Sequence, residues 1–289
     1  MDGPSASAAS TRARAVTDFE PGSRTVAWTG PEAVGAGHGA GEGRIRTLYG
    51  AAGGSRSVRL MAMCGRYATT RSAADLSAWF EAVDATGEAG GVVPRYNLAP
   101  TDPAPLVHLA AGERVLSVGR WGLLPHWARD PRAGARMINA RVETVATTRA
   151  YAEAYARRRA LVPADGWYEW RRVGSTRQAY YLTPHDGSVL AFAGLWSRWG
   201  PARLLTFTVL TTAAAGPLAA VHDRMPLVLP PSRWAEWLAG EPPPPGIADG
   251  RLEIRPVGPA VGNVRNDGPE LVRRVDPRPV PEPTQPTLF

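Results

Sequence analysis

The residues that could do chemistry are few and easily named. The chain has one cysteine, Cys64, and no lysine, so all 33 of its Lys and Arg residues are arginine. A lone cysteine excludes an internal disulfide and any multi-cysteine zinc or iron–sulfur site. Without lysine there is no lysine Schiff base, so amine chemistry must use the chain's own α-amino group. Cys64 directly follows Met63, and a chain started at Met63 and trimmed of its methionine would begin with Cys64.

An N-terminal cysteine is a 1,2-aminothiol with two nucleophiles. The ordinary pKa is about 7.7–8.0 for the α-amine and about 8.5 for the thiol, so a usable fraction of each is nucleophilic near neutral pH. The amine can capture an aldehyde as an imine, and the thiol can then close a five-membered thiazolidine ring. An internal cysteine cannot do this because its nitrogen is an amide. The alternative is that Cys64 is a small buried residue, the usual fate of a lone cysteine.

The sequence around and after this cysteine contains six dense motifs. They are Met63-Cys64-Gly65-Arg66-Tyr67, Arg95-Tyr96-Asn97-Leu98-Ala99-Pro100, Trp121-Gly122-Leu123-Leu124-Pro125, Asn139-Ala140-Arg141-Val142-Glu143-Thr144, Ala164-Asp165-Gly166-Trp167-Tyr168-Glu169-Trp170 and His222-Asp223-Arg224-Met225-Pro226. In this order they closely resemble the SOS-response-associated peptidase (SRAP) family, the abasic-site processing proteins that crosslink to damaged single-stranded DNA. The resemblance runs from Met63 to about residue 270. Family members begin at the cysteine, whereas 63 residues precede it here.

The resemblance implies a covalent reaction at Cys64. Its α-amine and thiol would attack the ring-opened C1′ aldehyde of an abasic deoxyribose and form a stable thiazolidine crosslink. Glu169 would be the acid that moves protons during ring opening and imine formation. His222 would shuttle protons or bind the sugar hydroxyl, and Asn139 would orient the Cys64 amine. From residue type alone, a solvent-facing strand position suits Glu169 better, and a turn position suits Asn139 equally well. We expect neither a metal nor a cofactor.

The net charge of +7 and the isoelectric point of about 10.1 suggest an anionic partner, nucleic acid first. The resemblance implies that this partner is single-stranded DNA with abasic sites, held by guanidinium groups on phosphates and by an aromatic ring on a base. The expected DNA-binding residues are Arg66, Asn97, Trp127, Arg141, Arg149, Thr211 and Arg224. Such binding should be sensitive to salt and nearly indifferent to sequence.

The elements that must position these residues fall in the middle of the chain. Residues 1–63 are rich in Gly, Ala, Ser and Arg without apolar periodicity. We therefore predict a disordered extension there, and we favour a misassigned start over a propeptide. Residues 64–275 have the composition of one folded SRAP domain, and residues 276–289 form a proline-rich tail.

The proline-rich tail ends on two apolar residues. Gln285, Leu288 and Phe289 resemble the Gln-x-x-Leu-Phe peptide by which bacterial replication proteins dock on the sliding clamp. Apolar side chains at the end of an extended tether suit a pocket on a partner. We therefore name the clamp as a candidate partner, with an inert tail as the alternative.

Within the domain, periodicity predicts a helix that starts at Ser72 with Asp75 in its first turn and runs until Gly87, and a second helix at about 144–158. Strand-like runs lie at about 115–124, 160–171, 179–183, 189–199, 204–212, 226–229 and 252–257. Many short strands with few helices favour a single α+β domain built on an antiparallel, partly closed, barrel-like sheet flanked by helices.

Two other functions fit the same residues. One is a thiol peptidase using Cys64, His222 and Glu169, able to cleave itself before Cys64; the other is a non-catalytic reader of modified DNA bases. Strand cleavage by a lyase reaction is a further activity consistent with the crosslinking mechanism. No apolar run reaches the roughly 20 residues of a membrane helix, and no signal pattern is present. We therefore expect a monomeric, cytoplasmic and nucleoid-associated protein with no membrane partner.

Overall fold

A computed structural model of the chain describes residues 64–87, 91–173, 176–243 and 252–277. The disordered extension predicted for residues 1–63 and the clamp-binding peptide predicted for Gln285, Leu288 and Phe289 lie outside the described residues. None of the described helices is long and apolar enough to cross a membrane.

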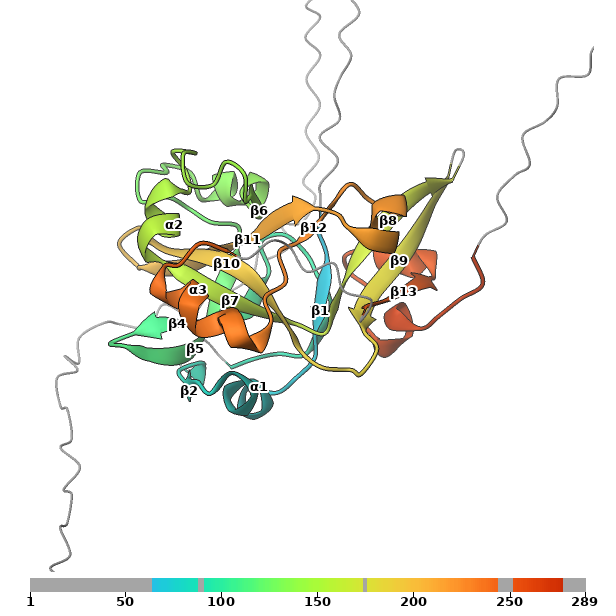
Figure 1. The fold of residues 1–289 in the computed structure, drawn as a ribbon, viewed down its shortest axis with the longest axis horizontal. Coiled ribbons are helices and arrows are strands. Elements are labelled where there is room, and N and C mark those ends of the chain that lie inside the picture. Colours follow the sequence, from blue (N-terminus) through green and yellow to red (C-terminus); the bar gives the residue numbers. More distant parts are fainter. Residues whose placement is uncertain (1–63, 88–90, 174–175, 244–251, 278–289) are drawn as a thin grey trace, which may run out of the picture. The chain divides into compact units, whose positions relative to one another are not determined.

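The described residues are mostly strand, with a few short helices (Figure 1). The strands are β1 (Tyr67–Thr69), β2 (Val83–Asp84), β3 (Arg95–Leu98), β4 (Pro103–Ala110), β5 (Glu113–Trp121), β6 (Asn139–Arg141), β7 (Arg159–Ala164), β8 (Gly166–Val173), β9 (Thr176–Pro184), β10 (Leu190–Trp199), β11 (Leu204–Ala213), β12 (Arg224–Pro226) and β13 (Leu252–Val257). The α-helices are α1 (Ala73–Phe80), α2 (Ala152–Arg157) and α3 (Trp234–Ala239). Short 3-10 helices include η2 (Pro131–Arg136), η3 (Gly216–Ala220) and η5 (Pro259–Gly262).

Five of these strands close into a barrel. Strands β11, β10, β7, β4 and β5 pair antiparallel in that order. Strand β5 then returns to β11 through a short parallel ladder, in which Arg120 and Trp121 pair with Thr206 and Phe207. The predicted α+β fold with a largely antiparallel, partly closed sheet is thus confirmed. The ladder that closes the barrel is parallel, and the pattern within a single strand carries no information about which strands meet there.

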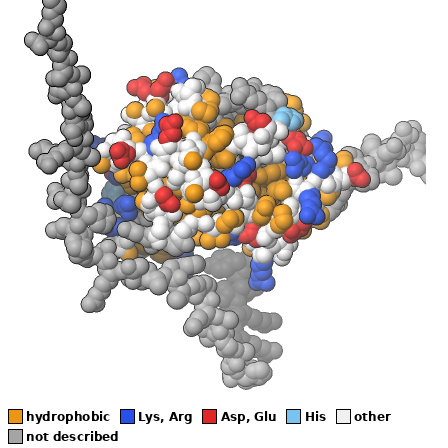
Figure 2. Space-filling model, turned by 90° about the horizontal axis from the view of Figure 1, so that it is seen from below, with side chains coloured by type: hydrophobic (Ala, Val, Ile, Leu, Met, Phe, Trp, Pro, Cys, Tyr) orange, Lys and Arg blue, Asp and Glu red, His pale blue; other side chains and the backbone are white. Residues whose placement is uncertain are grey.

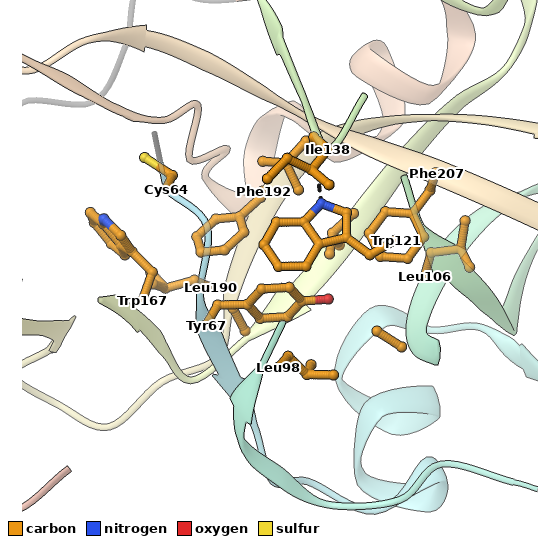
Figure 3. Close-up of a cluster of buried hydrophobic side chains, with 14 of the residues drawn as sticks. Cys64, Tyr67, Leu98, Leu106, Trp121, Ile138, Trp167, Leu190, Phe192 and Phe207 are labelled. Atoms are coloured by element: carbon orange, nitrogen blue, oxygen red, sulfur yellow. Dashed lines mark hydrogen bonds between the residues drawn. The ribbon is translucent and has the colours of Figure 1, made fainter. Parts of the chain in front are cut away.

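A second sheet, in the order β13-β9-β8-β1-β3, carries the start of the domain. Its strand β1 inserts Tyr67 into the barrel core, where the ring lies edge-on to Trp121 with centroids 5.0 Å apart. The Trp121 Nε1 donates a hydrogen bond of 2.9 Å to the carbonyl of Ile138, which satisfies its buried N–H. Figure 3 shows Cys64 at the end of this cluster where Trp167 also lies. One core therefore joins both sheets and reaches the cysteine.

The first predicted helix is confirmed at its start and wrong at its end. Ser72 and Asp75 form the expected capping box of α1. The helix ends at Phe80, well before Gly87, because Glu81 adopts a left-handed conformation with φ of 50°. Val83, which the helical spacing included, lies in β2 instead, and this strand pairs with β5.

Two other predicted elements are also shorter than expected. The predicted helix at 144–158 contains only α2, and turns occupy the residues before Ala152. The predicted strand at 160–171 is divided at Asp165 into β7 and β8, which belong to different sheets. The Asp165 carboxylate accepts hydrogen bonds of 2.6 Å from both the backbone and the hydroxyl of Thr70, so this corner is held to the segment after β1.

We expect Gly194→Ala to destabilise the barrel by about 2 kcal/mol through overpacking. A Cβ atom on Gly194 in β10 would lie 2.8 Å from Cγ2 of Val162 and 3.2 Å from the carbonyl oxygen of Thr208. Denaturant unfolding measures the change. Gly87→Ala is the matched control, because nothing lies within 4 Å of the position that its Cβ would take and its φ is not positive. Equal stability of the two variants would contradict tight closure at Gly194.

Candidate functional site around Cys64

Cys64 lies just before β1, where the two sheets meet. The residue is 4% exposed and has a φ of 42°, in the left-handed region that non-glycine residues rarely adopt. Its carbonyl accepts a hydrogen bond of 3.4 Å from Nδ2 of Asn139, and its thiol lies 3.9 Å from the carbonyl oxygen of Arg224. Contacts from β6 and β12 thus hold this residue from two sides.

Glu169 on β8 faces Cys64 from the second sheet. It is 2% exposed, so the solvent-facing position that residue type alone favours is wrong. Its carboxyl hydrogen bonds with both the thiol and the backbone N–H of Cys64. The other oxygen, Oε1, has no hydrogen-bond partner among the residues that the structure describes. A buried acceptor left open beside a nucleophile is a place where a ligand could bind.

The protonation of this pair follows from burial. Burial raises the pKa of the Glu169 carboxyl to about 8, although its hydrogen bonds from Cys64 act in the opposite direction. Burial, followed by the nearby Glu169, also raises the pKa of the Cys64 thiol well above its usual range. At pH 7 the site therefore holds a protonated carboxyl and a neutral thiol, and Glu169 is able to donate a proton.

Asn139 contacts Cys64 directly, and His222 contacts the same Arg224 carbonyl that the Cys64 thiol faces. Asn139 is placed by β6, which pairs with β11, and its own carbonyl accepts a hydrogen bond of 3.1 Å from the hydroxyl of Tyr151. The Nδ1 atom of His222 lies 3.0 Å from the backbone nitrogen of Arg224 and 3.1 Å from the carboxylate of Asp223. Its Nε2 makes no hydrogen bond within the described part of the chain, so this nitrogen is available to a substrate. Their catalytic roles stay predictions.

Four of the seven expected DNA-binding residues are engaged inside the protein. Arg224 makes a two-pronged ion pair with Glu143, at 2.6 and 2.9 Å, and also donates to the carbonyl of Thr211, which is fully buried. This network holds β12 against the turn that follows β6. Sequence reasoning did not single out Glu143, although it lies inside one of the motifs.

The second engaged pair is Arg66 and Asn97. Arg66 donates to Oδ1 of Asn97 and to the carbonyl of Val261, both at 2.9 Å. Asn97 is fully buried, and its Nδ2 donates to the carbonyls of Asn263 and Asn266. These two residues therefore fasten the segment that begins with η5. Contact of Arg66, Asn97, Thr211 and Arg224 with DNA stays a prediction.

The other three expected residues present exposed side chains. The guanidinium of Arg149 lies 4.9 Å from the centroid of the Trp127 ring, and Trp127 is 45% exposed. Both line a cavity of about 320 Å³, whose wall includes His126 and Glu153, with Nδ1 of His126 3.2 Å from the Glu153 carboxylate. Arg141 is exposed on β6. This arrangement could hold a base against an aromatic face beside a cation.

The chain matches a known protein family over most of this domain. The family model described as SOS response associated peptidase (SRAP) matches residues 63–264. This chain belongs to the SRAP family. The membership predicted from the motifs is therefore confirmed.

Named relatives of this SRAP chain come from distant organisms. The abasic site processing protein YedK of Escherichia coli (strain K12) is 34% identical over 229 residues, covering 74% of this chain and 100% of YedK. The abasic site processing protein YoqW of Bacillus subtilis (strain 168) is 31% identical over 222 residues, covering 73% and 99%. The abasic site processing protein HMCES of Gallus gallus is 29% identical over 259 residues, covering 73% and 77%.

Solved structures share the fold of this SRAP chain. A phage-related protein from Bordetella bronchiseptica is 30% identical with a TM-score of 0.53, covering 67% of this chain and 94% of its own. A protein from Bacteroides thetaiotaomicron has a TM-score of 0.64 at 20% identity, covering 73% and 100%. The latter likeness concerns the fold alone.

We predict that Glu169 makes this SRAP chain less stable as the pH rises from about 4.5 to 8. In that window the unfolded state ionises at its ordinary pKa of 4.5, while the folded state keeps its proton up to about 8. Unfolding therefore releases a proton, and the stability contributed by this group falls by roughly 3–5 kcal/mol across the window. Glu169→Gln should lack this fall when unfolding is measured from pH 4 to 9. Parallel pH profiles for the two proteins would contradict the raised pKa.

The expected DNA-binding residues that are engaged inside the protein should matter for stability, whereas the exposed ones should not. Asn97→Ala removes a fully buried side chain that donates to the carbonyls of Asn263 and Asn266 and accepts from Arg66, and it should cost about 3 kcal/mol. Trp127→Ala removes an exposed side chain and should change stability by less than about 0.5 kcal/mol. Chemical denaturation of both variants tests this, and a stable Asn97→Ala protein would show that the Asn97 contacts do not hold the η5 segment.

Proposed function

We propose that this protein processes abasic sites in DNA by forming a covalent thiazolidine crosslink through Cys64. Support comes from membership of the SRAP family and from relatives named abasic site processing proteins. The observation that carries the proposal is the Glu169 carboxyl, buried and hydrogen-bonded to both the thiol and the backbone nitrogen of Cys64. In a chain that begins at Cys64, that nitrogen is the α-amine.

The reaction we propose uses the α-amine, the thiol and Glu169 in turn. The α-amine adds to the C1′ aldehyde of the opened sugar, giving a carbinolamine. At that stage the nitrogen is uncharged, as it is in the structure, where burial raises the pKa of Glu169 to about 8; the protonated carboxyl gives its proton to the hydroxyl, which leaves as water. The thiol returns a proton to the Glu169 carboxylate, and its sulfur bonds to the iminium carbon to close the ring. One water is released, and the acid is regenerated.

The surrounding residues support this order of steps. Asn139 binds the Cys64 carbonyl and so holds the residue in its left-handed conformation, which directs the nitrogen and the thiol toward Glu169. His222 offers Nε2 to a sugar hydroxyl. Exposed Trp127, with the Arg149 guanidinium beside it, offers a stacking surface for a neighbouring base.

A thiol peptidase is the weaker candidate for this site. Such an enzyme needs a thiolate, but burial and Glu169 raise the pKa of the Cys64 thiol. The side chain that hydrogen bonds with the thiol is a carboxyl, whereas an imidazole would be expected to activate a peptidase cysteine. The same imine would allow β-elimination of the DNA strand, and ring closure by the thiol competes with that lyase reaction.

The proposal predicts a heat-stable adduct on a denaturing gel when protein starting at Cys64 meets single-stranded DNA carrying one abasic site. Cys64→Ala, also started at residue 64, keeps the α-amine but cannot close the ring. It should therefore lose the heat-stable adduct and give an imine that borohydride traps, with more strand cleavage. Glu169→Gln should slow adduct formation at least about 10²-fold at pH 7.

Control samples separate the three functions. Acetylation of the α-amine should abolish the adduct, whereas a thiol peptidase would tolerate it, and a reader of modified bases would bind equally well with Cys64→Ala. Protein that retains residues before Cys64 should also form no adduct, because the nitrogen is an amide. Absence of a heat-stable adduct from protein with a confirmed free α-amine would refute the proposal.

A further inference from the structure

The hairpin of β8 and β9 carries three arginines that the motifs did not assign. Strand β8 passes Glu169 and continues to Arg171 and Arg172, and β9 begins with Thr176 and Arg177. All three arginine side chains are exposed. Figure 1 shows the hairpin running outward from the body of the protein, away from β1. The strand that supplies the Glu169 acid therefore leads directly into a basic surface.

The pairing of the two strands sets how these charges lie. Arg172 pairs directly with Arg177, so both side chains occupy one face of the hairpin. Arg171 lies two residues after Glu169 and shares its face, because side chains alternate along a strand, whereas Arg172 and Arg177 lie on the opposite face of the hairpin. Like charges directly opposite each other destabilise an antiparallel pair. None of the three arginines forms an ion pair with a carboxylate of the described residues.

Several other arginines of the domain are held in ion pairs. Arg224 is paired with Glu143, and Arg255 and Arg274 share Glu253 in an ion-pair cluster. On the face seen in Figure 2, arginine side chains gather toward the right, the end that β8, β9 and β13 form in Figure 1. The hairpin therefore holds positive charge that the described protein leaves unneutralised.

We propose that Arg171, Arg172 and Arg177 bind the phosphodiester backbone of the single-stranded DNA that flanks the lesion; this inference rests on the proposed function. A strand rises about 3.4 Å per residue, similar to the roughly 3.4 Å per nucleotide of a stacked DNA strand. The guanidinium of Arg171 thus meets a phosphate about two nucleotides from the nucleotide held at Cys64, and those of Arg172 and Arg177 meet the following phosphates, about three to four nucleotides away, where the DNA passes around the hairpin. Continuity with the site through β8 favours DNA over an acidic peptide as the partner.

The test compares a triple variant, Arg171→Gln/Arg172→Gln/Arg177→Gln, with a control that removes the same charge elsewhere. The control is Arg136→Gln/Arg157→Gln/Arg203→Gln, whose arginines are exposed and outside the ion pairs of the described residues. The probe is single-stranded DNA with a reduced abasic site, which cannot form an imine, flanked by either eight nucleotides or one on each side. The dissociation constant is measured against salt concentration.

On the long DNA, the hairpin variant should bind roughly 100-fold more weakly at 0.1 M salt than the control, with a salt slope shallower by about 2, as three lost single-strand phosphate contacts require. On the short DNA, the two variants should bind alike. DNA with eight nucleotides on only one side then shows which flank the hairpin contacts.

Several outcomes would overturn the inference. One is equal affinity of the two variants for the long DNA. Another is a hairpin variant that loses affinity for a polyglutamate peptide but not for DNA. The hairpin variant should unfold at the same temperature as wild type or higher, since a like-charge pair is removed. If it does not fold, Arg172→Gln and Arg177→Gln singly should each lower the slope by about 0.7. Failure of the proposed function shows differently, as a wild-type protein that binds the reduced DNA but forms no adduct with unreduced abasic-site DNA of either length.

Discussion

A carboxyl buried without a countercharge sets the chemistry of this protein. Glu169 lies in the seam between two sheets, and its hydrogen bonds come from Cys64, with no ion pair to it among the described residues. Ionising it there would cost several kcal/mol, because the charge would lose its hydration and gain no partner. The group therefore stays protonated near neutral pH. If Glu169 were in a salt bridge, the fold would be held equally well. The carboxyl would then be ionised, and it would have no proton to donate beside the nucleophile.

The position of that acid depends on two sheets sharing one core. Glu169 belongs to the sheet of β8, whereas Asn139 and Arg224 reach Cys64 from strands that extend the barrel. Tyr67 and Trp121 pack together across the two sheets. Because the same core fixes both sides, a shift of either sheet would separate the acid from the cysteine. The site needs no deep hollow, since its precision comes from this shared packing.

Patterns of neighbouring residues in the sequence predicted most of the strands. They did not predict features that depend on which strands, or which distant residues, contact one another. The strand runs near β9, β10, β11 and β13 were close to their observed bounds, because residues that favour strands cluster in them. Residue type could not tell which face of β8 is buried. Aromatic residues flank Glu169 in sequence but lie on the opposite face of the strand, so neither Tyr168 nor Trp170 signalled its burial. Contacts such as Arg66 with Asn97 join distant residues, and no local rule finds them.

The net charge of +7 is a poorer guide to binding than the pairing of each arginine. Arg66 and Arg224, both inside motifs, are occupied by internal acceptors, while the β8–β9 hairpin, which no motif covers at its tip, carries charge that remains unpaired among the described residues. Exposed ion pairs contribute little to stability, so neutralised surface arginines do not explain why a chain would be basic. Arg171, Arg172 and Arg177 carry charge that no carboxylate of the described residues offsets, and an anionic partner would relieve their mutual repulsion. The partner of each arginine, more than the net charge, therefore indicates where an anion binds, and it indicates the end of β8 and not the centre of the site.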